Sequence, residues 1–414
     1  MIDNDQVIHK TDVLIVGSGM VGSSLAIALS NVGLRVALVD QVDPLVQTGG
    51  EFDGRASAIA ATPQKMLNQI DVWRHLGKNF SPIEDIRVVD AESSLFLHYN
   101  YEDVLCEALG FMVENRHFRQ ACRAQIQNNK NIIFLAPTKI NQILRGVGGV
   151  HAFLTNGAQV KSGLVIGADG KGSKVRESAG IDCTTWSYHQ TAIVLTVDHA
   201  VPHHNIAYEH FLPAGPFAIL PLRGERGEKN RSSIVWTEKF NLAEKILNLS
   251  NSDFTSEFKC RFGDYLGDPT FVGPRWAYPL SLQYTETCIS ERLALIGDAA
   301  HVIHPIAGQG LNLGLRDVAA LAEVLTDAKR LGLDIGSVGV LEKYQKWRRF
   351  DSSVMLAMTD GLNRLFSNDI SPIKAARDFG LATINKANPL KKFFMLHAMG
   401  SVGDLPRLLK GEPL

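Results

Sequence analysis

The sequence predicts an α/β protein built on a parallel sheet, with a second and mostly antiparallel sheet inserted into it and a helical C-terminus. Three observations predict this arrangement. Near the N-terminus, short apolar runs alternate with a helical repeat of apolar residues. In the middle of the chain, strand-like runs are separated by long polar connections. Near residue 293 the pattern of a short apolar run returns, and an amphipathic helix follows it.

The N-terminal element is a βαβ unit. Asp12–Val16 and Leu34–Asp40 are short apolar runs, typical of strands that are buried on both faces. Between them, apolar residues recur at helical spacing from Val21 to Val32, and Gly33 gives the helix a stop. A helix that joins two such strands implies that the strands are parallel.

The middle of the chain has a different pattern. Ala192–Asp198, Phe217–Leu222 and Ser232–Thr237 are expected strands of an antiparallel sheet. Leu293–Ile296 is again a buried strand, and Leu311–Arg330 has the apolar periodicity of an amphipathic helix. The parallel-sheet domain is therefore expected to be discontinuous in sequence.

Composition excludes several classes of protein. The 414 residues are 45% hydrophobic and 21% charged with a net charge of -1, which is ordinary for a globular protein and offers nucleic acid no positive field. The five cysteines have no CxxC spacing, so no zinc site or redox pair is predicted. The acidic and polar first residues predict no secretory signal, and the sequence has no continuous run of about 20 apolar residues. We expect a cytoplasmic protein that binds no nucleic acid.

The first motif, Gly17–Gly22 (GSGMVG), lies between the first strand and the first helix. Gly17 permits a tight turn, Gly19 lets the backbone approach a pyrophosphate, and Gly22 lets the helix pack close to the strand. Asp40 ends the second strand, where a carboxylate can accept hydrogen bonds from ribose hydroxyls. In this context the motif predicts a Rossmann-like dinucleotide site, and a glycine-rich turn without a ligand is the alternative.

The second motif is Leu164–Arg176, in which an apolar strand runs into Asp169-Gly170. On its own this pair is a common turn signal, so the segment gains meaning only from its neighbours.

The third motif is Arg292–Asp317, in which a buried strand ends at Gly297-Asp298. A carboxylate at that position can meet a second sugar or polyol hydroxyl, and the later glycines allow a flat ligand to approach a helix start. His301 and His304 have no third ligand at suitable spacing, so no metal site is predicted.

In this order the three motifs resemble those of the class A flavoprotein monooxygenases, the group similar to 4-hydroxybenzoate hydroxylase. Gly167–Gly170 with Arg176 resembles the group's second motif, which contacts FAD and the pyridine nucleotide. Gly297–His301 resembles its third motif, whose aspartate holds the ribityl chain of FAD.

A narrower resemblance covers nearly the whole chain. His304–Gly314 with Asp317 is similar to the signature of the ubiquinone-biosynthesis hydroxylases. Asp53–Ala58 fits that family's DxRxxA segment, in which Arg55 is expected near the flavin, and Val113–Arg116 resembles its VEN segment.

The motifs and the resemblance together assign two sets of residues. The expected FAD-binding residues are Gly17, Gly19, Met20, Val21, Gly22, Asp40, Arg55, Arg116, Asp169, Gly170, Arg176, Gly297, Asp298, Leu311 and Asn312. The expected catalytic environment of the flavin ring is Pro305, Gly308, Gln309 and Gly310, with no side chain assigned as an acid or a base.

The resemblance implies a chemistry and a set of partners. FAD is expected to be bound non-covalently, with NADPH or NADH as a transient co-substrate and O2 as the source of the hydroxyl oxygen. The expected substrate is a polyprenyl phenol or benzoquinol. The resemblance also implies membership of a ubiquinone-biosynthesis complex and peripheral contact with the inner face of a membrane.

It further implies a division of the chain. Residues 1–180 and 286–365 are the expected FAD-binding domain, 181–285 the substrate domain, and 366–414 a C-terminal helical segment, with 76–105 a candidate addition to the substrate domain. Within the C-terminal segment, Pro389–Leu409 combines basic and apolar residues. An interfacial helix at a membrane and a helix docked on the FAD-binding domain are equally compatible with it.

Other functions remain open at this point. The same FAD-binding shell occurs in hydroxylases of other small aromatic compounds, in prenyl-chain reductases and in halogenases, whose WxWxIP segment is absent here. A related shell without flavin binds prenylated GTPases, but the intact motifs at Gly17, Asp298 and Gly310 argue against that alternative.

Overall fold

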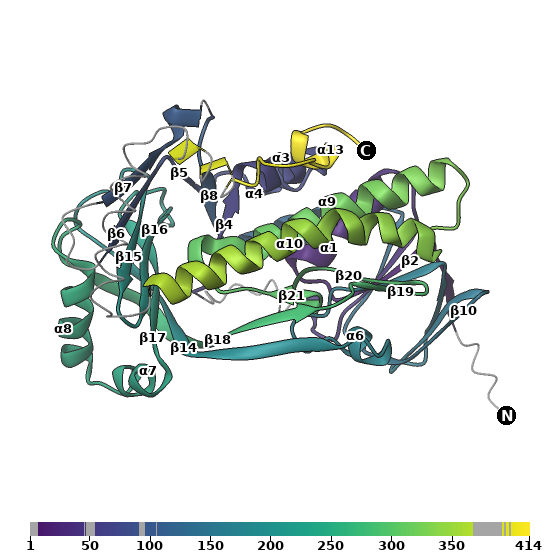
Figure 1. Cartoon of the computed structure of the whole chain (residues 1–414), viewed down its shortest axis with the longest axis horizontal. Coiled ribbons are helices and arrows are strands. Elements are labelled where there is room, and N and C mark those ends of the chain that lie inside the picture. Colours follow the sequence, from purple (N-terminus) through teal and green to yellow (C-terminus); the bar gives the residue numbers. More distant parts are fainter. Residues whose placement is uncertain are drawn as a thin grey trace.

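The computed structural model describes residues 7–44, 46, 54–90, 96–104, 106–366, 391–392, 395–396 and 399–414. Two large sheets dominate it. Figure 1 shows the long strands β14 (Cys183–Asp198) and β18 (Thr270–Thr285) running from one sheet toward the other, with the long helices α9 (Gln309–Arg330) and α10 (Val338–Phe366) above them.

The first large sheet has six strands. In spatial order they are β19 (Ile289–Ser290), β20 (Leu293–Leu295), β13 (Leu164–Gly167), β2 (Val13–Val16), β3 (Val36–Val39) and β9 (Ile132–Leu135). All neighbouring strands are parallel except β19 and β20. The βαβ unit predicted from the sequence is present, with α1 (Met20–Asn31) between β2 and β3.

Both faces of this sheet are covered, which explains why its strands are continuous apolar runs. Val13 and Ile15 face a core that they share with α1, α9, α10 and α5 (Asn115–Gln127). Leu14 points to the opposite face. There it meets a four-stranded sheet of β1 (Ile8–Lys10), β12 (Gln159–Ser162), β11 (Gly149–Leu154) and β10 (Ile140–Gly146).

The second large sheet has eight strands. In order they are β21 (His301–Val302), β18, β14, β17 (Arg231–Lys239), β16 (Gly215–Leu222), β15 (Ile206–Leu212), β6 (Asp85–Asp90) and β7 (Phe96–Asn100). Only the β15–β6 pair is parallel. Two of the three strands that the structure describes in the 76–105 region, β6 and β7, thus belong to this sheet, next to β15.

The two faces of the eight-stranded sheet meet different partners. Phe217 and Trp236 pack on helices α7 (Phe240–Leu247) and α8 (Asn251–Phe262). On the other face, Ala207 and Leu222 pack on a three-stranded sheet of β4 (Ala56–Ala60), β8 (Gly110–Glu114) and β5 (Ser81–Ile83). This second face is therefore the one that looks toward the parallel-sheet domain.

The other short helices whose complete lengths lie within the described residues are placed around these sheets. They are α3 (Ala61–Gln69), α4 (Trp73–Leu76), α6 (Lys174–Ser178) and α13 (Arg407–Lys410), with 3-10 turns at Tyr101–Val104, Gly297–Ala299 and Ile306–Gly308.

The predicted fold class is confirmed, and the boundaries differ in instructive ways. The strand expected at Ala192–Asp198 begins nine residues earlier, at Cys183. Its first half is polar and mostly exposed, so no apolar run marks it, and it is held instead by pairing with β18. A strand segment that is paired through its backbone but has exposed side chains shows no apolar pattern in the sequence.

The end of the chain returns to the core. Leu408 and Leu409 are buried in the cluster that includes α1 and α9, and Met395 and Met399 pack with Leu109. The Trp347 indole N–H donates to the carbonyl of Asp404 at 2.7 Å. These contacts favour docking for the described part of the C-terminal segment, while Phe393 and Phe394 lie outside the described residues.

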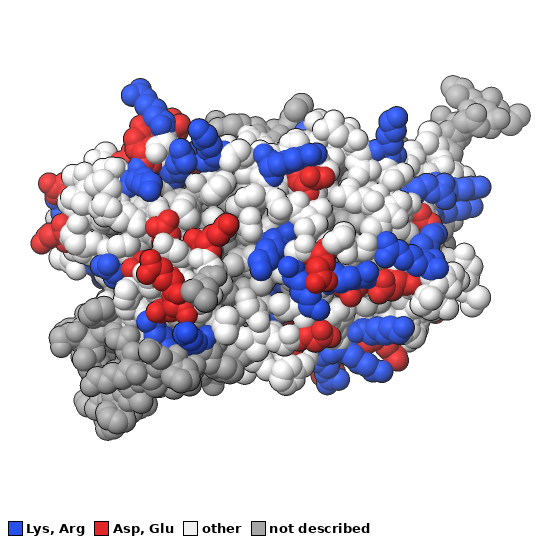
Figure 2. All heavy atoms as spheres, turned by 90° about the horizontal axis from the view of Figure 1, so that it is seen from above, with Lys and Arg blue, Asp and Glu red and all other residues white. Residues whose placement is uncertain are grey.

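The distribution of surface charge and the apolarity of the helices indicate which partners the protein can contact. On the face in Figure 2, acidic and basic side chains are interspersed rather than gathered by sign. Within the part of the chain that the structure describes, no helix has the length and apolarity needed to cross a bilayer.

We predict that Leu409→Ala lowers the free energy of unfolding by about 2–5 kcal/mol, because it leaves a cavity in the main core. Leu331→Ala is the matched control, since Leu331 is 72% exposed and its truncation should change stability by less than about 0.5 kcal/mol. Chemical denaturation of both variants measures the difference. Equal stabilities would contradict a docked C-terminus.

Candidate functional site

The predicted motifs meet at one edge of the parallel sheet. Gly17 follows β2, Asp40 follows β3, Asp169 lies beyond β13, and Gly297 lies beyond β20. The carboxyl ends of parallel strands share an edge, which is where open α/β sheets bind ligands.

The glycines of the first motif are required for two different reasons. Gly17 has φ of 105°, and a Cβ there would lie 2.3 Å from the carbonyl oxygen of Ala168. A Cβ on Gly22 would lie 2.0 Å from the carbonyl oxygen of Gly17. Gly19 is different, because a Cβ there would meet no atom within 4 Å. Gly17 and Gly22 are therefore required by packing within the protein, whereas Gly19 adjoins open space.

Helix α1 begins at this open space. Gly19 is its N-cap and supplies no side-chain cap, so the amide groups of the first turn, at Met20 and Val21, remain available to a ligand. Val21 also fills the gap to the third motif. A Cβ on Gly314 would lie 2.8 Å from Val21 Cγ2, and a Cβ on Gly297 would lie 3.3 Å from Cγ1.

Asp40 fastens the glycine loop. Its Oδ2 accepts hydrogen bonds from the Ser18 N–H at 2.6 Å and the Ser18 hydroxyl at 2.8 Å, and its Oδ1 accepts from the Val42 N–H at 2.8 Å. A carboxylate has about four lone-pair positions, so about one remains for a ribose hydroxyl.

The second motif consists of a helix cap and a bridge. Asp169 accepts hydrogen bonds from the backbone N–H groups of Lys174 and Val175, at the start of α6. The Arg176 guanidinium is buried and donates to the carbonyls of Lys171 at 3.0 Å and Ala299 at 2.9 Å. Arg176 thus joins the turn at Gly170 to the third motif.

Asp298 follows β20 and is exposed to solvent. The protein around its carboxyl is nevertheless dense enough that burial raises its pKa, against smaller opposing effects of His301 and Lys171.

The start of helix α9 is fastened to β4. The Asn312 side chain donates to the carbonyl of Ala58 at 2.8 Å and accepts from the Ala60 N–H at 2.9 Å. Gly308 has φ of 63°, and a Cβ there would lie 3.0 Å from the Cβ of Ala58. A Cβ on Gly310, in contrast, would meet no atom within 4 Å.

Helix α9 therefore also begins beside open space, and no side chain caps it. Pro305 precedes the 3-10 turn that leads into the helix, and Gln309 and Leu311 lie in its first turn.

The DxRxxA and VEN segments lie side by side although 58 residues separate them. The Asn115 N–H donates to the Arg55 carbonyl at 2.9 Å, and the Ser57 hydroxyl donates to Asn115 Oδ1 at 2.7 Å. The Arg55 side chain is exposed, whereas the Arg116 guanidinium pairs with Glu114 at 2.6 Å. Asp53 lies outside the described residues.

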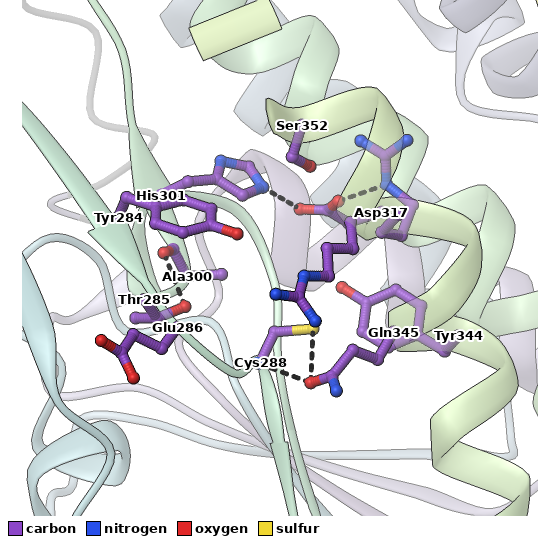
Figure 3. Close-up of a pocket in the computed structure, with 12 residues that line it drawn as sticks. Tyr284, Thr285, Glu286, Cys288, Ala300, His301, Asp317, Tyr344, Gln345 and Ser352 are labelled. Atoms are coloured by element: carbon purple, nitrogen blue, oxygen red, sulfur yellow. Dashed lines mark hydrogen bonds and ion pairs between the residues drawn. The ribbon is translucent and has the colours of Figure 1, made fainter. Parts of the chain in front are cut away.

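A buried carboxylate holds the third motif in place (Figure 3). Asp317 is 1% exposed and accepts hydrogen bonds from the Gly297 N–H at 2.9 Å, His301 Nε2 at 2.7 Å and Arg348 Nε at 2.7 Å. Burial alone would raise the pKa of Asp317, but His301 and Arg348 outweigh it and lower the pKa to about 2. Arg348 also pairs with Asp351, which pairs with Arg316 at 2.6 Å.

The space beside this network is small. A cavity of about 30 Å³ lies between α10 and β18, lined among others by His301, Arg348 and Gln345, and it has room for water but not for an aromatic ring. It is separate from the open spaces beside Gly19 and Gly310.

Sequence reasoning missed part of this arrangement. Asp317 enters the sequence prediction only as part of the third signature. Arg348 and Asp351 carry no local signal, because the partners that make them part of the site, Asp317 and Arg316, lie on the preceding helix. His301, considered as a metal ligand, bonds Asp317 instead. It belongs to no group of three or more metal-ligating side chains within the described part of the chain.

Comparisons with known proteins agree on one family. Residues 10–350 match the family described as "FAD binding domain". The chain is 50% identical to the ubiquinone hydroxylase UbiL of Rhodospirillum rubrum over 406 residues, covering 97% of this chain and 93% of that protein. It is 31% identical to the 3-demethoxyubiquinol 3-hydroxylase of Escherichia coli, covering 95% and 99%.

A solved structure shows the same fold. The p-nitrophenol 4-monooxygenase PnpA of Pseudomonas putida superposes with a TM-score of 0.79 at 18% identity, covering 96% of this chain and 100% of that one.

We predict that Asp317→Asn lowers the free energy of unfolding by about 3–5 kcal/mol, because it leaves the Arg348 charge buried without its carboxylate. The folded-state pKa of Asp317 is depressed, so its contribution is present above the unfolded value near 4 and is lost as pH falls toward 2.

Denaturation at a series of pH values checks both parts. The parent should lose stability between about pH 4 and pH 2 more steeply than Asp317→Asn does. Glu412→Gln, at an exposed position, is the control and should follow the parent. Parallel curves for the parent and Asp317→Asn would show that Asp317 is not linked to folding.

Proposed function

Because the chain belongs to the family of FAD-dependent hydroxylases of ubiquinone biosynthesis, we propose that it hydroxylates the ring of a polyprenyl phenol or benzoquinol with NADH or NADPH and O2. It is a flavoprotein monooxygenase. The observation that carries the assignment of the site is a pair of uncapped helix starts, at Gly19 and Gly310, that both open on space free of protein atoms.

The residues at this edge fit FAD. The open side of Gly19 and the first amides of α1 suit a pyrophosphate. Asp298, a solvent-accessible carboxylate beyond the end of β20, suits the hydroxyls of the ribityl chain. Gly310, at the start of α9, suits the edge of the isoalloxazine ring.

Once bound, FAD would supply the redox chemistry, accepting electrons from the nicotinamide and using them to activate O2. The protein supplies binding and orientation. The N–H groups of Gly310 and Leu311, at the positive end of the α9 dipole, would stabilise negative charge on the ring. Pro305 and Gly308 shape the turn that precedes these donors.

Several predicted residues are proposed to act as positioning residues. Arg176 holds the second motif against the third, Asn312 holds β4 against α9, and Asp169 caps α6. Arg55 and Arg116 flank β4 and β8 and are proposed to lie near the flavin or the nicotinamide.

We also propose a division of labour between the sheets. Residues 1–180 and 286–365 bind FAD, except that β6 and β7 join residues 181–285 in the substrate-binding sheet. A prenylated substrate dissolves in lipid, so the protein is proposed to collect it at a membrane surface or from a partner of the same pathway.

We predict that Gly19→Leu folds but lowers the affinity for FAD at least about tenfold, because its side chain fills the space assigned to the pyrophosphate. Its φ of -62° suits any residue. Gly339→Leu, also beside open space near a helix start, is the control and should bind FAD like the parent. Flavin fluorescence titration of the apoproteins measures this, and equal affinities would refute the site.

The reaction is tested with the purified holoprotein, NADH or NADPH, and a benzoquinol that carries one isoprenyl unit. We predict O2 uptake and a ring-hydroxylated product containing one atom of isotopically labelled O2. Saturation of the prenyl chain without O2 uptake would instead identify a prenyl-chain reductase. Consumption of NADPH with hydrogen peroxide as the sole product would contradict the proposed substrate class.

A further inference from the structure

One row of side chains crosses the eight-stranded sheet from β18 to β7. The register of the paired strands aligns Trp276, Val194, Val235, Ala218, Glu209, Val88 and Leu97. Six of these seven side chains are apolar or aromatic. Glu209 is the one ionisable residue in the row.

This row lies on the face of the sheet that looks toward the FAD-binding domain. Ala207, two residues before Glu209 on β15, packs with Ala56 and Ala58 of β4. At the far end of the row, the Trp276 ring lies 1.8 Å from where a Cβ on Gly54 would be. Tyr208 and His210 flank Glu209 in sequence but point to the opposite face, where they contact the aromatic core around α8.

The face is connected to the proposed flavin site through β4. Ala58 lies against Gly308, at the start of α9, and also packs near Ala207. Residues two apart on a strand lie on the same face, about 7 Å from each other. The distance from Ala207 to Glu209 is therefore roughly the width of an aromatic ring.

Glu209 is not closed off from solvent. Its side chain is partly accessible to solvent, and yet burial raises the pKa of its carboxyl to about 7. No hydrogen bond or ion pair is formed by this carboxyl among the described residues. Asp298 combines accessibility and desolvation in the same way, at the site assigned to FAD.

A carboxyl in such a place is costly without a partner, because burial of a polar group must be offset by hydrogen bonds. We propose that Glu209 accepts a hydrogen bond from a ring hydroxyl of the aromatic substrate and so selects rings that carry a free hydroxyl. This inference rests on the proposed function, since it names the polar contact of the same substrate-binding face.

The charged pair Asp198–Arg231 also lies on this face, four residues from Val235 along β17. The side chains nearest to Glu209 are uncharged. On β6 and β7 its neighbours are Val88, Leu97 and Tyr99, and burial raises the pKa of Tyr99 to about 12. On β16 and β17 they are Ala218, Val235 and Thr237, none of which is charged.

The charged groups of the packed sheet β4–β8–β5 lie at its ends. They are Arg55 before β4, Glu84 directly after β5, Glu114 at the end of β8, and Arg116 in the first turn of α5. None of them contributes to the shift at Glu209, which burial alone causes.

The test uses the FAD-loaded protein and two ligands that differ by one methyl group, 2-prenylphenol and its methyl ether. Binding is followed through the flavin absorption spectrum at pH 8. The parent should bind the phenol at least about tenfold more tightly than the ether, because a hydrogen bond to a charged acceptor is among the stronger neutral-donor contacts. Glu209→Leu, of similar volume, should bind the two about equally.

The pH dependence separates a direct contact from a structural role. The parent's preference for the phenol should fall as pH drops from 8 to 6, because the acceptor becomes protonated, and Glu209→Gln should show a smaller preference with no such dependence. Because glutamine has nearly the same shape as glutamate, Glu209→Gln allows the proposal to be tested even if Glu209→Leu does not fold.

Two results would overturn the proposal: no preference in the parent, or an unchanged and pH-dependent preference in Glu209→Gln. Product analysis on the same samples keeps the two hypotheses apart. If the phenol binds with the expected preference but no hydroxylated product forms, the proposed reaction fails while the Glu209 contact stands. If product forms without the preference, the contact fails and the reaction stands.

Discussion

The arrangement of the site depends on the buried carboxylate of Asp317. One of its oxygens holds the Gly297 N–H at the end of β20 and His301 at the start of β21, and the other holds Arg348 of α10. A buried charge must be paired, and the pairing requires its partners to lie at well-defined distances and angles. The strand end, the turn around Asp298 and the two long helices are therefore fixed relative to one another by a single group. The Asp298 carboxylate is not used in this network, because a different aspartate carries this structural role.

The three motifs are also locked to each other by contacts that involve no ligand. Val21 of the first motif fills the gap left by Gly297 and Gly314 of the third. Arg176 of the second donates to the carbonyl of Ala299 in the third. Much of what makes these motifs recognisable is thus mutual packing, and a smaller part, at Gly19, Asp298 and Gly310, faces outward.

This distinction explains how far the sequence could be interpreted. The βαβ unit and the strand ends at Gly17, Asp169 and Gly297 follow from local patterns, because an apolar run and a glycine turn each have a short-range cause. Asp40 and Arg176 were expected at the cofactor, and the structure engages both in bonds within the protein.

The contacts that could not be predicted from the sequence join residues that are far apart along the chain. Arg348 meets Asp317 from another helix, 31 residues away, and Leu409 joins a core formed mostly by the N-terminal half. Glu209 lies in a strand of alternating exposure whose flanking residues are also polar, so nothing local tells which face it occupies. Only the pairing of β15 with β6 and β16 places it among apolar neighbours.

The eight-stranded sheet can accommodate such a residue because its two faces have separate tasks. One face builds its own core, in which Trp236 and Phe217 are fully buried against the phenylalanines of α8, and this packing stabilises the sheet without help from the other side. Among the described residues, the second face is packed only in part: Ala207 and Leu222 contact the β4 sheet, and Val194 and Ala192 form a distinct small cluster. Since these two clusters are not continuous, the stability of the sheet does not require the strip between them to be filled by protein. A carboxylate that would be excluded from the first face is tolerated there, at the place where a ring bound against the flavin would supply its missing partner.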